Sequence, residues 1–210
     1  MEYNPFSRYN RQDTIQSVYH YQDTEVYINK LNIRNPDILL AMENDLTYHR
    51  LSELHLNPLK GRFGLTHLLN IHKHIFQDLY PFAGKIREED ITKGYTCFCS
   101  CKFIVENLNT LLQNLKQEKY LVGLNIKDFT ERSAYYLSEL NMIHPFREGN
   151  GRAIREYYRC MALKSGYVIE WSLVDKNELL NAFIRSVDKK LCELTQCIYK
   201  VIENKPKVMI

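Results

Sequence analysis

The sequence predicts an all-α protein, a helical bundle that carries one small β-hairpin. Apolar residues recur at three- and four-residue steps through most of the chain after residue 35, which is the spacing of one face of a helix. Proline, asparagine and glycine stand where these periodic segments would begin or end. The segment 88–103 instead combines β-prone residues with a turn residue, Gly94. We therefore expect helices and one hairpin.

The expected elements follow one another closely along the chain. Asn35 is placed as the N-cap of a first helix, with Pro36 at its first position. A second helix starts at about Thr66 and is stopped by Pro81 and Gly84. After the hairpin, four helical stretches are expected: 102–117, 125–143, 152–164 and 175–203, the last with a break near residue 188.

One domain accounts for the whole pattern. The 210 residues are enough for one compact domain, and they contain no internal repeat, low-complexity tract or Ser/Gly-rich linker. Residues 1–20 are polar and tyrosine-rich without a sustained period, so we expect an N-terminal arm and not a part of the core. The domain is expected over 21–204, and 205–210 is a C-terminal tail.

Composition and charge exclude some classes of protein. The 28 basic and 25 acidic residues are mixed along the chain and leave a net charge of +3, which does not indicate a nucleic-acid-binding protein. No apolar run reaches the roughly 18 residues of a membrane span. The N-terminus also lacks a secretory signal, so we expect a cytoplasmic protein. An effector exported by a signal that is not cleaved would have the same kind of N-terminus.

The cysteines do not form an evident metal site or disulfide framework. The segment "CFCSC" places Cys97, Cys99 and Cys101 at alternate positions, on one face of an extended segment. No fourth ligand is evident, and the chain lacks the C-x-x-C spacing of a zinc site. Reduced thiols in a strand are the preferred interpretation.

Three histidines lie in the second expected helix. His67 and His74 share a helical face, whereas His72 does not, so the three do not form a metal-binding set. We interpret them as solvated histidines or histidines at the edge of the core.

The segment "HPFREGNGR" joins one expected helix to the next. Pro145 prevents the first helix from continuing, and Gly149 and Gly151 allow unusual backbone angles on either side of Asn150. A Gly-Asn-Gly run directly before a helix points several backbone N–H groups toward one spot, where the helix dipole adds a positive field. The segment therefore predicts an anion site.

Charged side chains around this anion site favour a polyphosphate ligand. Arg152 and Arg155 are three residues apart on the next helix, and guanidinium groups match phosphate oxygens in a bidentate manner. Glu148 would repel phosphate unless a divalent cation lay between them, which points to Mg²⁺. His144 has the ordinary pKa range of a general base for a hydroxyl. The chemistry inferred is transfer of a phosphorus-centred group.

These residues carry a resemblance to a known family. The stretch "HPFREGNGRAIR" resembles the full signature of the Fic family, H-x-F-x-[D/E]-G-N-G-R-x-x-R, and matches it at every specified position. The resemblance continues upstream through "LYPFAGKIR", "DITKG" and "YYLSELNMIHPF", and covers a core of about 56–166. It implies the Fic fold, a helical bundle with a β-hairpin flap, and transfer of AMP from ATP to a hydroxyl of a target protein.

The resemblance also implies roles for individual residues. His144 would deprotonate the target's Ser, Thr or Tyr, and Glu148 would hold Mg²⁺ between the α- and β-phosphates. Arg152 would reach the β-phosphate and Arg155 the γ-phosphate. Phe146 would turn inward as an anchor of the loop. The phosphate cradle would consist of Gly149, Asn150 and Gly151, and the flap of residues around Lys93 and Gly94. A target segment would dock on this flap by strand addition.

Several alternatives stay open within this resemblance. The Doc-like kinases have a lysine where this chain has Gly151, so Gly151 favours transfer of AMP over transfer of phosphate. Transfer of phosphate, phosphocholine or UMP, or removal of AMP, are alternatives on the same fold. A nucleotide-binding module without catalysis is disfavoured because His144 is intact.

Regulation is the last expectation from the sequence. Many Fic proteins carry an inhibitory helix with the pattern [S/T]-x-x-x-E-[G/N], whose glutamate pairs with the second arginine of the signature. No Ser or Thr of this chain has Glu four residues further on, and Tyr199 with Glu203 and Asn204 comes near the pattern. We favour a small antitoxin partner that brings a glutamate to Arg155, with Glu203 as the internal alternative. The protein would then be a toxin, and a bacterial topoisomerase is a possible target.

Overall fold

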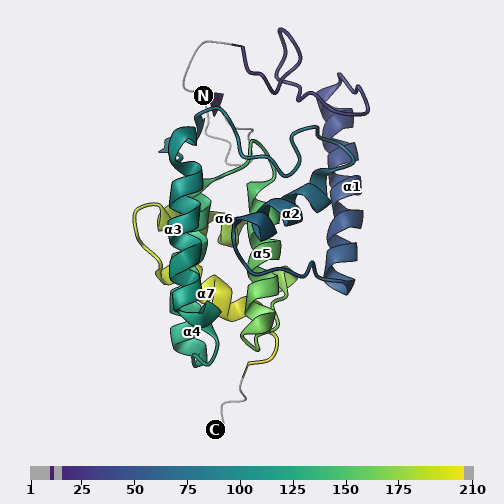
Figure 1. The fold of residues 1–210 in the computed structure, drawn as a ribbon. Coiled ribbons are helices and arrows are strands. Elements are labelled where there is room, and N and C mark those ends of the chain that lie inside the picture. The colour runs from purple at the N-terminus through teal and green to yellow at the C-terminus, as the bar shows by residue number, and fades with distance from the viewer. Residues whose placement is uncertain (1–9, 12–15, 206–210) are drawn as a thin grey trace.

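The computed structural model describes residues 10–11 and 16–205, so most of the expected arm and tail lies outside the described residues. Within them the fold is helical with one small antiparallel sheet, which confirms the predicted fold class. The view in Figure 1 follows the chain through α1 to α7. The helices are α1 (Pro36–Leu56), α2 (Leu65–Phe76), α3 (Ile104–Gln117), α4 (Ile126–Ile143), α5 (Asn150–Lys164), α6 (Lys176–Ser186) and α7 (Cys192–Val201).

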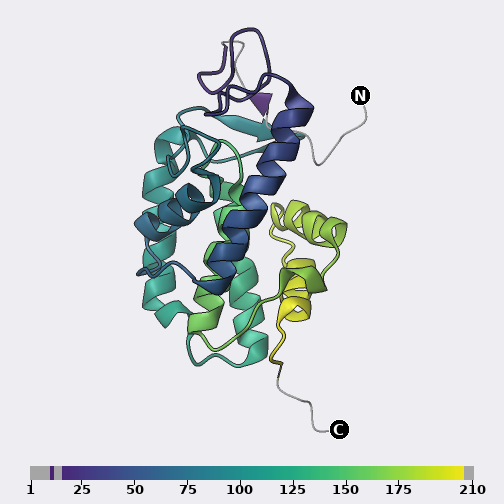
Figure 2. The ribbon, with the colours of Figure 1, turned by 90° about the vertical axis from the view of Figure 1, so that its right-hand side faces the viewer.

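The helices surround a core in which α4 and α5 contact most of the others. On one side α4 packs against α3 and α7, and on the other side α5 packs against α2, which in turn packs on α1. Figure 2 shows α6 and α7 together as a pair beside the rest of the bundle. Short 3₁₀ helices join these parts: η1 (Cys101–Phe103), η2 (Lys119–Leu121) and η3 (Trp171–Leu173). No helix of the described residues has the length and apolar character needed to cross a membrane.

Local capping explains several helix boundaries. The Asn35 side chain accepts hydrogen bonds from the N–H groups of Asp37 and Ile38, as expected for an N-cap. The expected break near residue 188 separates α6 from α7. The second helix ends before the predicted stop, because the N–H groups of Leu79 and Tyr80 both bond to the Phe76 carbonyl and form a turn there.

The hairpin forms as predicted, and it gains a third strand. β2 (Ile91–Lys93) pairs antiparallel with β3 (Thr96–Cys97) across a turn in which Gly94 has a φ of 58°. β1 (Asn10–Arg11) pairs antiparallel with the other edge of β2, which gives the order β1-β2-β3. A hairpin alone leaves one row of β2 backbone groups without a sheet partner, and β1 supplies that partner.

Part of the segment assigned to the N-terminal arm is packed into the domain. Tyr19 is buried, its ring contacts Phe82 edge-on, and its hydroxyl accepts a hydrogen bond from the Glu88 N–H. The description of residues 1–20 as lying outside the core is therefore wrong for Tyr19. The periodicity criterion missed it because this irregular stretch is held by separate contacts, those of the Tyr19 ring and the hydrogen bonds of Ser17 and Val18 to Glu89, and not by a repeating apolar face.

Candidate active site

The loop between α4 and α5 is bounded by two left-handed residues. His144 is the C-cap of α4 with φ 48° and ψ 62°, and Gly149 is the N-cap of α5 with φ 76°. A Cβ at Gly149 would overlap the ring of Phe76, so both the backbone angle and the close approach require glycine. His144 has no such freedom and holds an uncommon conformation for a side-chain-bearing residue.

Asn150 closes this loop on itself. Its buried amide accepts a hydrogen bond from the Phe146 N–H at 2.8 Å and donates one to the Phe146 carbonyl at 2.7 Å. Phe146 is buried and stacks on the ring of His72, with 3.7 Å between centroids, which confirms its expected role as an inward anchor. The Asn150 side chain therefore shapes the loop, while its backbone N–H belongs to the N-terminus of α5.

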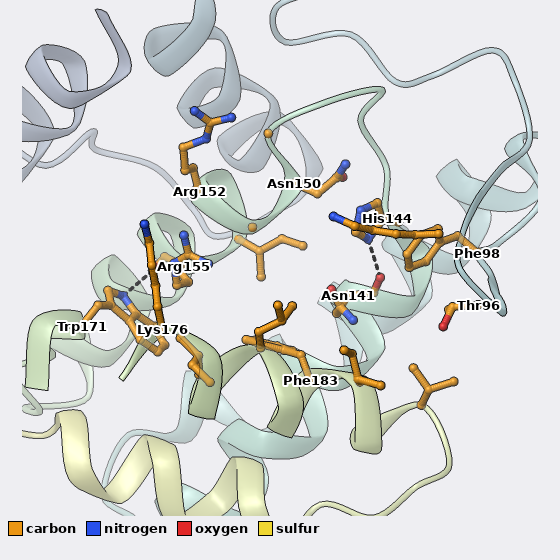
Figure 3. A pocket seen from close by; sticks show the side chains of 18 of the residues that line it. Thr96, Phe98, Asn141, His144, Asn150, Arg152, Arg155, Trp171, Lys176 and Phe183 are labelled. Carbon is orange, nitrogen blue, oxygen red and sulfur yellow. Dashed lines mark hydrogen bonds between the residues drawn. The ribbon is translucent and has the colours of Figure 1, made fainter. Parts of the chain in front are cut away.

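His144 is held as a neutral imidazole with a defined tautomer. Its Nδ1 is 2.8 Å from the Asn141 carbonyl, which can only accept, so Nδ1 carries the proton and Nε2 carries the lone pair. Burial, together with the positive charges of Arg87 and Lys93, lowers the pKa of His144 to about 3. The Phe98 ring from the segment after β3 stacks on the imidazole at 3.8 Å. Nε2 is therefore unprotonated at neutral pH, and Figure 3 shows the hydrogen bond from the His144 ring to Asn141.

The two arginines of α5 have different surroundings. Arg152 donates to the Glu43 carboxylate of α1 at 2.6 Å and to the Thr47 hydroxyl at 3.2 Å, and Figure 3 shows it turned away from the centre of the cavity. Arg155 lies toward the cavity, near Lys176. A Cβ at Gly151 would lie 3.1 Å from the Arg155 guanidinium, so a larger residue there would press on this arginine.

Glu148 contributes the acidic group of the site. Its carboxylate accepts a hydrogen bond from the Gly149 N–H at 2.8 Å and lies 3.7 Å from the Arg152 guanidinium. Among the described residues that line the cavity it is the one carboxylate. In the described part of the chain, no group of three or more histidine, cysteine or acidic residues could hold a metal by itself. A cation here would need ligand oxygens in addition to Glu148.

A cavity of about 630 Å³ joins these groups. This volume is in the range of sites for nucleotide-sized ligands. Its polar wall is the motif loop and the start of α5, and its rim includes Lys93 and Thr96 of the hairpin. The opposite wall comes from α6 and its C-cap residue; apart from Lys176 it is apolar, with Leu179, Leu180, Phe183, Ile184 and Val187.

The structure thus brings nearly all predicted site residues together. The lining includes His144, Glu148, Gly149, Asn150, Gly151, Arg152, Arg155 and Lys93. Gly94 does not line the cavity and is an exposed turn residue. Burial lowers the pKa of the Lys93 ammonium, an effect that Glu148 opposes.

His72 is a supporting residue that the sequence analysis misjudged. It is fully buried; its Nδ1 accepts a hydrogen bond from the Gly84 N–H at 2.8 Å, so its Nε2–H donates to the Glu148 carbonyl at 2.9 Å. Burial lowers its pKa to about 3. The interpretation as a solvated or core-edge histidine is therefore wrong for His72. Its spacing from Leu68 and Phe76, four residues to either side, places it on the buried face of α2 and could have indicated this.

Glu43 was also missed, although its pattern resembles the inhibitory one. Leu39, Glu43 and Asn44 fit [S/T]-x-x-x-E-[G/N] except at the first position. Glu43 is buried and pairs with Arg152, the first arginine of the signature. The second, Arg155, is the one that an inhibitory glutamate would meet, so Glu43 has a different partner.

The fold and the site define a class: a helical protein with a cavity of about 630 Å³ whose wall contains a neutral histidine and the N-terminus of a helix. The sequence model of the Fic/DOC family matches residues 62–160. The chain is also 39% identical to one relative of which it covers 78% and 40% identical to another of which it covers 76%. The chain belongs to the Fic/DOC family.

Two curated relatives and two solved structures illustrate this membership. The probable protein adenylyltransferase Fic of Escherichia coli is 39% identical over 158 residues, 75% of this chain and 78% of the relative. The protein adenylyltransferase VbhT of Bartonella schoenbuchensis is 39% identical over 164 residues, 78% of this chain. The match covers 34% of VbhT, so the chain spans about a third of that relative.

The structural neighbours include Fic domains solved with nucleotides. The N-terminal Fic domain of a putative cell filamentation protein from Bartonella quintana, with bound ADP, has a TM-score of 0.84 at 26% identity and covers 89% of this chain and 95% of its own. The BepC protein of Bartonella tribocorum, with bound AMPPNP, has a TM-score of 0.82 at 22% identity over 90% of this chain and 97% of its own, a likeness of fold.

Proposed function

We propose that the protein is a protein adenylyltransferase, which transfers AMP from ATP to a hydroxyl side chain of a target protein. The observation that carries the proposal is the buried neutral His144, with its lone pair on Nε2, in the wall of a nucleotide-sized cavity beside the N-terminus of α5. The relatives from Escherichia coli and Bartonella schoenbuchensis, both named protein adenylyltransferases, support the same activity.

The residues of this chain divide the reaction between them. The target's hydroxyl gives its proton to Nε2 of His144 as its oxygen attacks the α-phosphorus and pyrophosphate leaves. The first N–H groups of α5, which have no partner within the helix, receive phosphate oxygens at Asn150 and Gly151. Arg155 receives the γ-phosphate. Arg152 reaches the β-phosphate only by sharing its guanidinium with Glu43.

A magnesium ion fits the single carboxylate of this site. Mg²⁺ is commonly held by one or two carboxylates together with substrate phosphates and water, which matches a cavity whose described lining offers Glu148 alone. Glu148 would hold the ion, which would neutralise phosphate charge. The Glu148 backbone is fixed for this by His72, which binds its carbonyl.

The absence of a side chain at Gly151 argues against transfer of phosphate in place of AMP. A lysine at this position, as in Doc-like kinases, would begin with a Cβ 3.1 Å from the Arg155 guanidinium. Because Gly151 has no side chain, it does not displace the Arg155 guanidinium from the cavity. Attack at the α-phosphate with the polyphosphate along α5 is the arrangement that these contacts favour.

The biological setting is a further part of the proposal. We place the protein in the cytosol as a toxin that a small antitoxin inhibits by bringing a glutamate to Arg155. Glu203 is a poorer candidate for this role, because it follows α7, is exposed and does not line the cavity. Bacterial topoisomerases are the first targets to test.

Labelled ATP tests the proposed activity. The protein is incubated with Mg²⁺, a bacterial lysate and ATP labelled on either the α- or the γ-phosphate, with His144→Ala as the matched control. Label from α alone on a protein band, lost in the control, is the expected result. Label from γ, or equal α-labelling by His144→Ala, would contradict AMP transfer with this base.

A further inference from the structure

Arg87 is a buried arginine outside the signature that holds the start of the motif loop. Its backbone N–H donates to the Pro145 carbonyl at 2.9 Å. Its Nε donates to the His144 carbonyl at 2.8 Å, and Nη2 approaches the Ile143 carbonyl at 3.4 Å. Three consecutive carbonyls at the end of α4 are thus bound by one residue, whose side chain is 0% exposed.

The other side of the same guanidinium holds the flap. Nη1 donates to the Glu89 carbonyl at 2.6 Å, just before β2, and Nη2 donates to the Cys99 carbonyl, just after β3. Asp90 lies 3.8 Å from Nη1 and is the nearby carboxylate. Arg87 therefore joins both ends of the hairpin to the end of α4.

Both joined parts carry groups that meet at the reacting position. His144 ends α4 in a left-handed conformation, and its imidazole stacks on Phe98 of the flap segment. The last carbonyls of a helix have no N–H partner within the helix, so a donor from outside the helix can fix their orientation. At His144 and Ile143 this donor is the Arg87 guanidinium.

The charge of Arg87 acts on the imidazole as well. Arg87 from the segment before β2 and Lys93 from β2 both lower the pKa of His144, in addition to burial. Arg87 is the more buried of the two, with Asp90 as its partial counter-charge. A cation fixed behind the carbonyl of the base supports the neutral form that accepts a proton.

We propose that Arg87 is a positioning residue for the general base: it fixes His144 and the flap at one spacing, so that the base, the nucleotide and a docked target hydroxyl are aligned. The proposal rests on the proposed function for its kinetic part. Loss of this bridge lowers kcat without an equal loss in ATP binding or in the amount of folded protein.

Conservative substitution separates positioning from folding. Arg87→Lys keeps a positive charge but has no planar fork to bridge the end of α4 and the flap. Arg159→Lys is the matched control, since Arg159 is also a shielded arginine that bonds a carboxylate, Glu156, and a backbone carbonyl, that of Leu54, and it does not line the cavity.

The expected result is a selective loss. For Arg87→Lys, kcat for AMP transfer falls about 100-fold, the size expected for a misplaced catalytic group, while the Kd for ATP stays within about threefold. Circular dichroism shows a folded protein for both variants. A kcat within threefold of wild type for Arg87→Lys, or a loss equal to that of Arg159→Lys, would overturn the proposal.

A second measurement tests the positioning of His144 whether or not the protein transfers AMP. Nitrogen chemical shifts of labelled histidine report which imidazole nitrogen of His144 carries the proton. Wild type and Arg159→Lys are expected to show the Nδ1–H tautomer alone, and Arg87→Lys a mixture. An unchanged Nδ1–H tautomer in Arg87→Lys would refute the positioning of His144 independently of any activity.

Discussion

At the scale of residues, the site depends on side chains that are buried in an uncharged state. His144 is enclosed by the helix end, the flap ring of Phe98 and the cations Arg87 and Lys93. Such a group is a weaker base than a solvated histidine, but it is unprotonated at pH 7, so its Nε2 lone pair is available there. The same burial couples the site to the stability of the fold.

We predict that the protein loses stability between pH 7 and pH 5, in part through His144. Its pKa is lowered to about 3 in the folded state, whereas the unfolded chain binds the proton near pH 6.5. The unfolded state therefore takes up more protons as pH falls below 6.5, and this histidine costs about 2 kcal/mol of stability by pH 5. Urea unfolding at both pH values measures it.

Comparison with two variants isolates the contribution. The pH-dependent loss should be smaller by about 2 kcal/mol in His144→Ala. It should be unchanged in His49→Gln, because the His49 side chain is 72% exposed. An identical pH dependence in His144→Ala and wild type would contradict the prediction.

Apart from Lys93 and Gly94 of the flap, the site residues that the sequence predicted lie close together along the chain. His144 to Arg155 form one uninterrupted stretch, so the motif alone indicated the base, the carboxylate and the anion site. His72, Glu43 and Arg87 act on that stretch from 57 to 109 positions away. Contacts of this kind are produced by packing: the spacing of His72 indicates that it is buried, but not that it binds the Glu148 carbonyl.

At the scale of elements, α1 is attached to the site by charge as well as by apolar contact. Its buried face includes Glu43 and Thr47 beside Leu39 and Leu54. Glu43 binds Arg152 of α5 and also the Tyr80 hydroxyl. This polar face explains why the helix could be predicted from its cap and periodicity while its partner could not.

We predict that Glu43→Gln destabilises the protein by about 3 kcal/mol, because it removes the nearer carboxylate of the shielded Arg152 and leaves only Glu148, at 3.7 Å. The matched control is Glu193→Gln, which breaks the exposed ion pair with Arg185. That pair should contribute less than about 1 kcal/mol. Equal shifts of the urea midpoint for the two variants would show that the α1–α5 pair does not stabilise the fold.

At the scale of the whole molecule, the cavity lies between two parts of the bundle. The motif loop and α5 form one wall, and α6, from the α6–α7 pair, forms the other. The sequence predicted these helices but not that α6 would face the motif, since its apolar residues could equally pack in a core. The apolar wall is therefore a result of tertiary arrangement.

We predict that ATP with Mg²⁺ stabilises the whole protein against thermal unfolding. A ligand at 100 times its Kd contributes about 2.7 kcal/mol, which shifts the midpoint by several degrees for a chain of this size. At the same ATP concentration, Arg155→Ala should show a smaller shift. The shift of the exposed-site control Arg185→Ala should equal that of wild type. A full shift in Arg155→Ala would remove Arg155 from the nucleotide site.

With β1 in place, the β3 edge of the flap is the edge that faces the cavity rim and could pair with a further strand. In the described sheet β1 occupies one side of β2, and β3 is the outer strand on the opposite side. Thr96 of β3 is also on the rim of the cavity. A target peptide that extends this sheet antiparallel at β3 runs in the same direction as β2. Its N- and C-terminal halves then meet different surroundings, so the enzyme would distinguish a peptide from its reversed sequence.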